Sequence, residues 1–300
     1  FETGRIGSQV VQFPFIVGHE CAATVAAVGK AVRQVKVGDP VVVEPAVPCH
    51  RCDQCDKGRE NTCFHMRFLG TPGQGDGCLS EFILMPEECC LPTHGRITIE
   101  QGVLCEPLAI GVYAVQQARL WPAADVAILG AGPIGLSCMV AAQAEGVRAC
   151  YLTEKIEERV KTARDGGATW VGNPLKEDIV AAILRRQPLG MDVAFECAGQ
   201  QETIDQGIEL LKPGGKLMLV GIPREDRVSF AIDKIRRKEI TIINIRRQNG
   251  CTGKAIDLIA SGKVRPDFMV THRFELDRVQ EAFELVAGYR DGAVKAMIEM

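Results

Sequence analysis

The chain has 300 residues, a length that suits two ordinary domains better than one. Its formal net charge of −3 leaves no basic surface for nucleic acid or anionic lipid, and no apolar run approaches the roughly 20 residues of a membrane helix. We therefore expect neither a nucleic-acid partner nor a membrane partner. The 13 cysteines are odd in number and partly clustered, which does not fit a secreted disulfide framework and favours a cytoplasmic protein.

Short β-segments and loops are predicted for residues 1 to about 109, with residues 41–43 as a clear strand. From residue 125 the pattern changes to alternating strands and helices, which predicts crossover connections and a parallel sheet. Towards the C-terminus, residues 279–287 predict a helix and residues 295–299 a strand. The strands predicted for the sheet are residues 125–129, 147–152, 192–197, 216–220 and 240–245, and the first helices are residues 133–145 and 156–164.

A glycine-rich turn follows the first strand of the sheet and opens a helix. Gly130, Gly132 and Gly135 have the spacing GxGxxG. The first glycine makes the tight turn, the second admits a pyrophosphate, and the third lets the helix pack closely on the sheet. The helix N-terminus supplies N–H groups and a partial positive charge for phosphates, and Pro133 suits its first turn. The turn therefore predicts a dinucleotide-binding site.

An acidic residue follows the second strand of this unit. Glu154 lies where a carboxylate would accept hydrogen bonds from the ribose hydroxyls and repel a 2′-phosphate, although a solvated surface glutamate is the alternative. The residue predicts NAD as the cofactor rather than NADP. Arg159 is the nearby residue that could hold a phosphate instead.

Four cysteines follow one another at short spacing: Cys49, Cys52, Cys55 and Cys63. Four thiolates in a short loop make a closed tetrahedral site that suits structural zinc, and the metal supplies folding energy to a lobe with little core. Local disulfides, free thiols and an iron–sulfur cluster are the alternatives. A zinc ribbon for nucleic acid would need a basic surface, which the mixed charges of this segment do not provide.

A His-Glu pair, His19-Glu20, precedes a glycine, a strand, the four cysteines, the GxGxxG turn and the acid. In this order the sequence resembles the medium-chain dehydrogenase/reductase family from end to end. Glu106-Pro107-Leu108 is similar to the Glu-Pro-Leu segment of its polyol dehydrogenases, such as those for sorbitol and xylitol. Alcohol dehydrogenases carry a zinc-binding cysteine there. The resemblance implies hydride transfer between a secondary alcohol and NAD, with catalytic and structural zinc.

The resemblance also implies roles for single residues. His19 and Glu20 would bind the catalytic zinc, and Glu106 would lie at the metal directly or through water, with Cys105 as the alternative ligand. Arg247 would contact both the cofactor and the substrate hydroxyls, so Glu106 and Arg247 are the catalytic candidates. The implied cofactor pocket consists of Gly130, Gly132, Pro133, Ile134, Gly135, Glu154, Arg159, Val220, Gly221, Ile222, Ile245 and Arg247.

The implied fold is α/β, with a GroES-like β-rich catalytic domain beside a doubly wound parallel Rossmann domain. The catalytic domain would take residues 1–109, with its N-terminal part missing, and the Rossmann NAD-binding domain residues 110–246. Residues 247–300 would return to the catalytic domain. The last Rossmann strand, residues 240–245, should be a sheet edge that a symmetric partner covers, giving a homodimer or homotetramer.

The family's further zinc-ligand cysteine would lie upstream of Phe1. We therefore expect this 300-residue chain to keep the structural zinc and NAD binding, and to lack a competent catalytic zinc and turnover. Residues 246–249 differ from the Phe-Arg-Tyr segment of well-known polyol dehydrogenases. Another zinc dehydrogenase of the family, acting on threonine, a sugar or a simple alcohol, is one alternative function. A non-enzymatic NAD- and zinc-binding homologue is the other.

Overall fold

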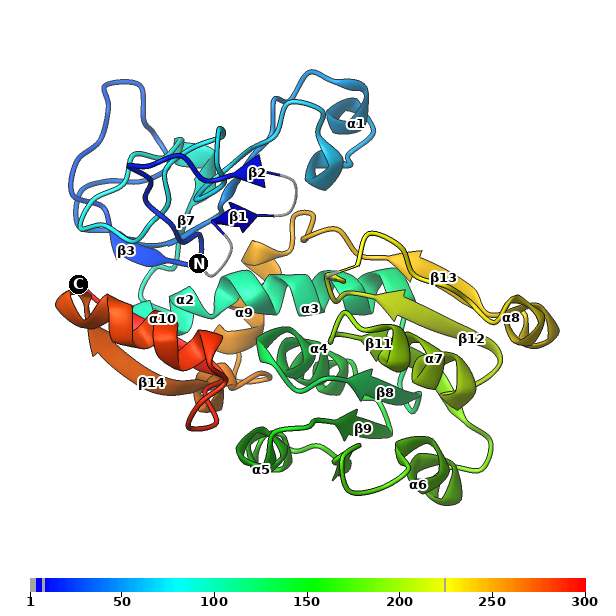
Figure 1. Cartoon of the computed structure of the whole chain (residues 1–300). Coiled ribbons are helices and arrows are strands. Elements are labelled where there is room, and N and C mark those ends of the chain that lie inside the picture. Colours follow the sequence, from blue (N-terminus) through cyan, green and yellow to red (C-terminus); the bar gives the residue numbers. More distant parts are fainter. Residues whose placement is uncertain (1–3, 7–8, 224) are drawn as a thin grey trace.

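A six-stranded parallel sheet organises the larger part of the computed structural model, which describes residues 4–6, 9–223 and 225–300 (Figure 1). The strand order is β10-β9-β8-β11-β12-β13, which is the order 3-2-1-4-5-6 of a doubly wound dinucleotide-binding fold. The prediction of a parallel sheet with its last strand at an edge is therefore confirmed. The strands are β8 (Asp125–Leu129), β9 (Ala149–Thr153), β10 (Trp170–Gly172), β11 (Met191–Glu196), β12 (Leu211–Leu219) and β13 (Thr241–Asn244).

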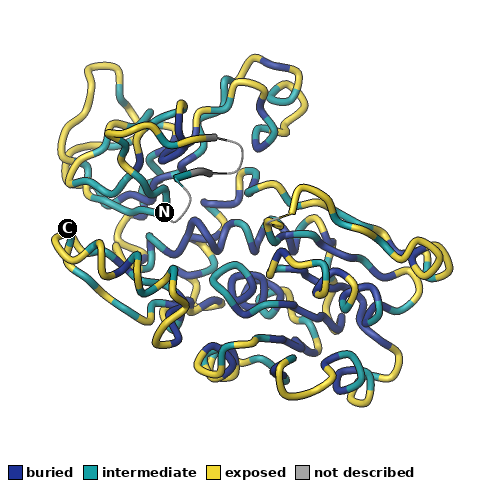
Figure 2. Tube along the Cα trace, in the orientation of Figure 1, coloured by how far each residue is buried: buried dark blue, intermediate teal, exposed yellow. Residues whose placement is uncertain are grey.

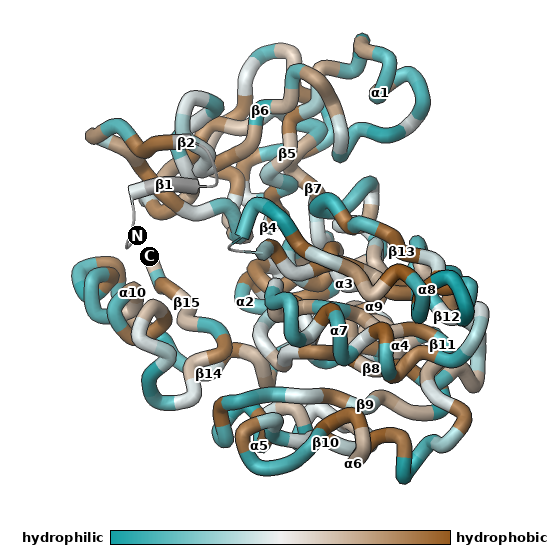
Figure 3. The backbone as a smooth tube through the Cα atoms, turned by 45° about the vertical axis from the view of Figure 1, so that its right-hand side comes forward, coloured by the Kyte–Doolittle hydropathy of each residue, from teal (hydrophilic) through white to brown (hydrophobic). Residues whose placement is uncertain are grey.

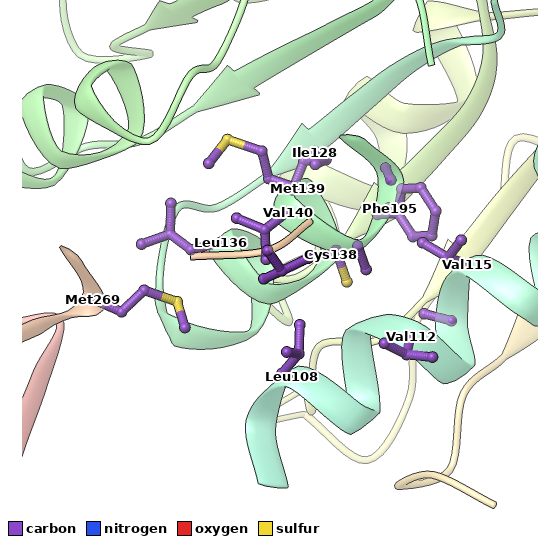
Figure 4. Close-up of a cluster of buried hydrophobic side chains, with 14 of the residues drawn as sticks. Leu108, Val112, Val115, Ile128, Leu136, Cys138, Met139, Val140, Phe195 and Met269 are labelled. Carbon is purple, nitrogen blue, oxygen red and sulfur yellow. The ribbon is translucent and has the colours of Figure 1, made fainter. Parts of the chain in front are cut away.

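Helices cover both faces of this sheet, because its central strands are apolar on both sides. Figure 4 shows one cluster of buried side chains, among them Leu108, Met139 and Phe195. A second cluster on the opposite face includes Ile183, Ile204 and Ile235. The first face carries α3 (Cys105–Ala118), α4 (Pro133–Ala144), α5 (Glu157–Asp165) and α9 (Thr252–Ala260), and the second carries α6 (Ile179–Arg186), α7 (Gln201–Leu210) and α8 (Ile232–Lys238).

The N-terminal part is built from short strands and loops, and it lies above the sheet in Figure 1. Its largest sheet is antiparallel, in the order β3-β4-β7. Figure 2 shows that its loops are mostly exposed, whereas α3 and α4 are mostly buried. Its strands are β1 (Arg5–Ile6), β2 (Gln9–Val10), β3 (Ala22–Thr24), β4 (Pro40–Val43), β5 (Ala46–Val47), β6 (Arg67–Phe68) and β7 (Cys90–Pro92). Its helices are α1 (Asp53–Asp56), η1 (Glu60–Thr62), η2 (Glu87–Cys89) and α2 (Ile99–Val103).

The C-terminal segment contacts both parts: Ala255, Ile256 and Ile259 of α9 belong to the core cluster on the sheet, and two ion pairs join the segment to the N-terminal part. Arg273 forms an ion pair of 2.7 Å with Glu100, and Arg96 forms one of 2.7 Å with Asp257. No helix among the described residues is long and apolar enough to cross a membrane. After α9 the segment contains η3 (Pro266–Met269), β14 (Val270–Glu275), η4 (Leu276–Arg278), α10 (Val279–Ala287) and β15 (Lys295–Glu299), with β14 and β15 paired in parallel.

Most predicted elements agree with the structure to within two residues, but two differences have physical causes. Strand β12 begins at Leu211, earlier than predicted, because Leu211 pairs with Met191 before a shift of register. The prediction of strands and loops up to residue 109 was wrong for its last part, where α2 and the start of α3 lie. A capping box of Thr98 and Gln101 begins α2, and this Thr-x-x-Gln spacing was a readable helix signal.

Candidate active site

Each of the three glycines in the turn before α4 suits its position for a different structural reason. Gly130 has a φ of +104°, a backbone conformation that favours glycine. A Cβ on Gly135 would lie 1.9 Å from the carbonyl oxygen of Gly130, so only glycine lets the helix start this close to the strand. A Cβ on Gly132 would meet only Arg159 Nη1, at 3.9 Å, which leaves room above the turn. Open space, a helix N-terminus and a facing cation suit a pyrophosphate.

Glu154 follows β9 and reaches the glycine-rich turn. Its Oε2 accepts a hydrogen bond of 3.0 Å from the backbone N–H of Ala131, and its Oε1 accepts bonds from the N–H groups of Lys155 and Ile156. The carboxylate is thereby held at the carboxyl end of the sheet, next to the turn, where an adenosine ribose would lie in this fold.

The side chain of Arg159 is more buried than contact with the cofactor alone would require. It is 8% exposed, and its Nε donates a hydrogen bond of 2.9 Å to the carbonyl oxygen of Ala293. Its guanidinium also lies 5.5 Å from the centre of the Tyr289 ring. This arginine therefore joins the dinucleotide turn to the C-terminal segment, and only its Nη1 faces Gly132.

Most of the remaining pocket candidates lie at the carboxyl ends of β12 and β13. A Cβ on Gly221 would lie 2.4 Å from the backbone nitrogen of Gly199, so the loops after β11 and β12 touch there. Val220 is buried, whereas Ile222 is 89% exposed and free to meet a ligand. Ile245 donates its backbone N–H to Leu219 at 2.9 Å. Ile134, in the first turn of α4, packs against the main core.

Four thiols lie together around α1. The sulfur atoms of Cys49, Cys52, Cys55 and Cys63 all lie within 4.8 Å of one another, and Cys52 Sγ is 3.6 Å from Cys55 Sγ. The backbone N–H of Cys49 donates to Cys63 Sγ at 3.3 Å. Helix α1 has no buried residue, and the segment around it is largely hydrophilic in Figure 3. A tetrahedral metal ion suits these donors and would stabilise a lobe without an apolar core.

The ionisation of these thiols also favours a cation. Backbone N–H groups of Cys55 and Phe64 lower the pKa of Cys52 to about 6. Burial and the neighbouring thiols raise the pKa of Cys55 to about 12. One thiolate forms readily, whereas four together require a positive charge between them.

A second group of metal-binding side chains comes from distant parts of the chain. Ligand atoms of His19, Glu20 and Glu106 lie within 4.8 Å of one another. Burial, with a contribution from Glu44, raises the pKa of Glu106 to about 8, so this carboxylate also favours a neighbouring cation. Cys105 Sγ instead donates to the carbonyl oxygen of Gln101 at 3.5 Å, and this geometry favours Glu106 over Cys105 as a ligand.

Arg247 extends into the same site. Its guanidinium carbon lies 3.6 Å from the centre of the Phe68 ring, and the Phe68 ring lies 5.2 Å from the His19 ring. Burial and Arg246 lower the pKa of Arg247 to about 10. Its Nη1 is buried and has no hydrogen-bond partner among the described residues. A buried N–H without a partner is rare, so this donor is free to bond to an oxygen atom that enters the site.

The comparisons with known proteins agree with this geometry. Residues 133–261 match the family described as zinc-binding dehydrogenase, and residues 1–95 match the alcohol dehydrogenase GroES-like domain. A sorbitol dehydrogenase of Bacillus subtilis is 36% identical over 299 residues, which cover 99% of this chain and 84% of that protein. The chain belongs to the zinc-dependent medium-chain dehydrogenase family.

Two further relatives of this family are an enzyme and a solved structure. An L-idonate 5-dehydrogenase of Vitis vinifera is 33% identical, and the alignment covers 100% of this chain and 83% of that protein. A zinc-binding dehydrogenase from Sinorhizobium meliloti 1021, solved bound to NADP, has a TM-score of 0.89 and 30% identity, covering 96% of this chain and 84% of the other. As a medium-chain dehydrogenase, the protein is an oxidoreductase whose cofactors are zinc and a nicotinamide dinucleotide.

The sequence analysis missed some residues of the dehydrogenase site. Lys295 forms an ion pair with Glu20, and no local pattern could have shown a contact between residues so far apart. Glu44 Oε1 accepts the backbone N–H of Ala46 at 3.2 Å, and its Oε2 accepts a bond of 2.5 Å from Gln248 Nε2. Glu44 is an acidic residue directly after the buried strand β4, and this position was a sequence signal that could have identified it as a site residue.

Proposed function

We propose that this dehydrogenase oxidises a secondary hydroxyl of a polyol, such as sorbitol or xylitol, with NAD, or reduces the matching ketone. The observation that carries the proposal is the unpartnered Nη1 of Arg247 beside the His19, Glu20 and Glu106 group. A polyol presents a second hydroxyl next to the reacting one, whereas a monohydric alcohol does not. The sorbitol and L-idonate dehydrogenases among the relatives support the same substrate class.

We propose two metal sites. His19, Glu20 and Glu106 would hold the catalytic zinc, with Glu106 bound directly or through water, and the four cysteines would hold the structural zinc. The catalytic zinc would act as a Lewis acid on the substrate oxygen, and the bound nicotinamide would accept the hydride. The carboxylate of Glu106 would accept the proton of the reacting hydroxyl, and Arg247 would donate to the neighbouring hydroxyl and fix the orientation of the substrate.

For the cofactor, we propose NAD rather than NADP. Glu154 is held at the turn by Ala131, and a carboxylate there would accept bonds from a ribose diol and repel a 2′-phosphate. One relative was solved bound to NADP, so membership of the family alone does not decide between the two cofactors. Arg159, the rival phosphate ligand, donates from Nε and Nη2 to the carbonyl of Ala293, so only its Nη1 remains towards the turn.

We also propose a homodimer or homotetramer that covers the edge strand β13, because its apolar residues would otherwise form an exposed sheet edge. A reducing, cytoplasmic compartment is supported by the odd number and the partial clustering of the 13 cysteines.

The function is tested with the full-length, zinc-loaded enzyme and NAD, by following NADH formation with xylitol, sorbitol, L-threonine and 2-butanol. The proposal expects the highest kcat/KM with a polyol. A preference for L-threonine or 2-butanol would replace polyols by another substrate class. No turnover with any of them would favour a non-enzymatic homologue.

A further inference from the structure

The four-cysteine lobe, residues 49–63, is joined to the segment that carries Arg247. The link is Asn61 in η1, a side chain that is 7% exposed. Its Nδ2 donates one hydrogen bond of 3.0 Å to the carbonyl oxygen of Arg246 and another of 3.3 Å to the hydroxyl of Tyr113. Tyr113 belongs to α3, the helix that carries Glu106 in its first turn. One amide group therefore connects the lobe to both elements of the active site.

The residues on each side of Arg247 are fastened as well. Asn249 Nδ2 donates a bond of 2.7 Å to the carbonyl oxygen of Gly58, again in the cysteine lobe. Gln248 donates to Glu44, which follows strand β4. The residues before and after Arg247 thus have fixed positions, and two of the three bonds end in the lobe.

Arg247 itself depends on such support. Its φ is +53°, a left-handed conformation that a residue with a Cβ keeps only when its surroundings impose it. This conformation directs the guanidinium over Phe68, at 3.6 Å, and places Nη1 where it has no partner. If the carbonyl of Arg246 were released, the peptide could relax and the guanidinium would move away from the substrate.

We propose that the cysteine lobe positions Arg247 for substrate binding, and that Asn61 is the positioning residue through which it acts. Asn61 precedes Cys63 by two residues, so the same short turn holds a metal ligand and the bond to Arg246. A lobe that is exposed and lacks a core thereby contributes to substrate specificity as well as to stability. The proposal rests on the proposed function for the identity of the substrate, but the placement of Arg247 can be measured without turnover.

The test compares Asn61→Asp with Lys57→Ala in the full-length, zinc-loaded enzyme. An aspartate has the same shape and can accept a bond from the Tyr113 hydroxyl in place of the one that Asn61 donates, but it cannot donate to the carbonyl of Arg246. Lys57 lies in the same lobe, with a side chain that is 62% exposed, and serves as the control. The expected result for Asn61→Asp is a KM for xylitol raised about tenfold, as for one lost hydrogen bond, with kcat nearly unchanged. The KM for 2-butanol and the zinc content should stay at the wild-type values.

A second readout needs no substrate. Phenylglyoxal modifies accessible arginines, and peptide mass spectrometry gives the rate at Arg247. Asn61→Asp and Asn61→Ala should both increase this rate, while Lys57→Ala leaves it unchanged. An equal rise of KM for xylitol and 2-butanol, or an unchanged labelling rate, would overturn the proposal. If the wild type oxidises no polyol, the proposed function fails, and the labelling rate alone decides whether Asn61 positions Arg247.

Discussion

Replacing Arg247 by alanine removes one charged donor from the active site and leaves the backbone as it is. Alanine also has a Cβ, so the strain of the left-handed conformation at φ +53° is nearly the same in both proteins. The lost contact with Phe68 contributes about 1 kcal/mol, and the unpaired buried N–H that also disappears costs a similar amount. These effects offset each other, so Arg247→Ala should change Tm little.

The effect on the reaction should be larger. A hydrogen bond to a charged group contributes about 1.5–3 kcal/mol, which corresponds to a roughly 10- to 160-fold loss of kcat/KM. This loss should appear with xylitol or sorbitol, whose second hydroxyl accepts the bond. It should be much smaller with 2-butanol, which lacks that hydroxyl.

The assay measures kcat/KM with saturating NAD for xylitol and 2-butanol, in the wild type and in Arg247→Ala. Arg246→Ala is the matched control, because it removes the neighbouring, exposed arginine side chain. An equal loss with both substrates would refute the reasoning, since Arg247 would then serve only the cofactor or the fold.

Three further predictions concern the cofactor, the thiols and the assembly. The full-length enzyme should have a higher kcat/KM with NAD than with NADP, and Glu154→Ala should narrow the difference; an NADP preference in the wild type would instead point to Arg159. Cys63→Ser should remove about one zinc per chain by metal analysis and lower Tm, with NAD affinity preserved; an unchanged zinc content would contradict the four-thiol site. Light scattering at micromolar protein should show a dimer or tetramer, and a monomer alone would argue against a partner on β13.

The sequence predicted those parts of the site that are local in the chain. Gly130 is required by its own φ of +104° and Gly135 by the nearby carbonyl oxygen of Gly130, so the spacing of the turn carries this information locally. The four cysteines form one short lobe for the same reason. Placing Glu106 beside His19 required the resemblance to a family, because no spacing rule joins residues so far apart.

Contacts between distant segments could not be predicted in this way. The ion pair of Lys295 with Glu20 and the bond of Asn61 to Arg246 exist only once the C-terminal segment has packed against the first part of the chain. Helix α2 was missed although Thr98 and Gln101 gave a local signal for its start. For Arg159, the sequence suggested a cofactor contact. It did not show that two nitrogens of its guanidinium donate hydrogen bonds to the carbonyl oxygen of Ala293.

The most direct test of the central claim is the rate of NADH formation from xylitol by the full-length, zinc-loaded enzyme and by its His19→Ala variant. His19 belongs to the proposed catalytic metal site and lies outside the four-thiol lobe. The account predicts polyol oxidation by the wild type and loss of turnover in His19→Ala, which should keep the zinc of the cysteine lobe and its affinity for NAD. Undiminished turnover in His19→Ala would contradict the assignment of the catalytic site.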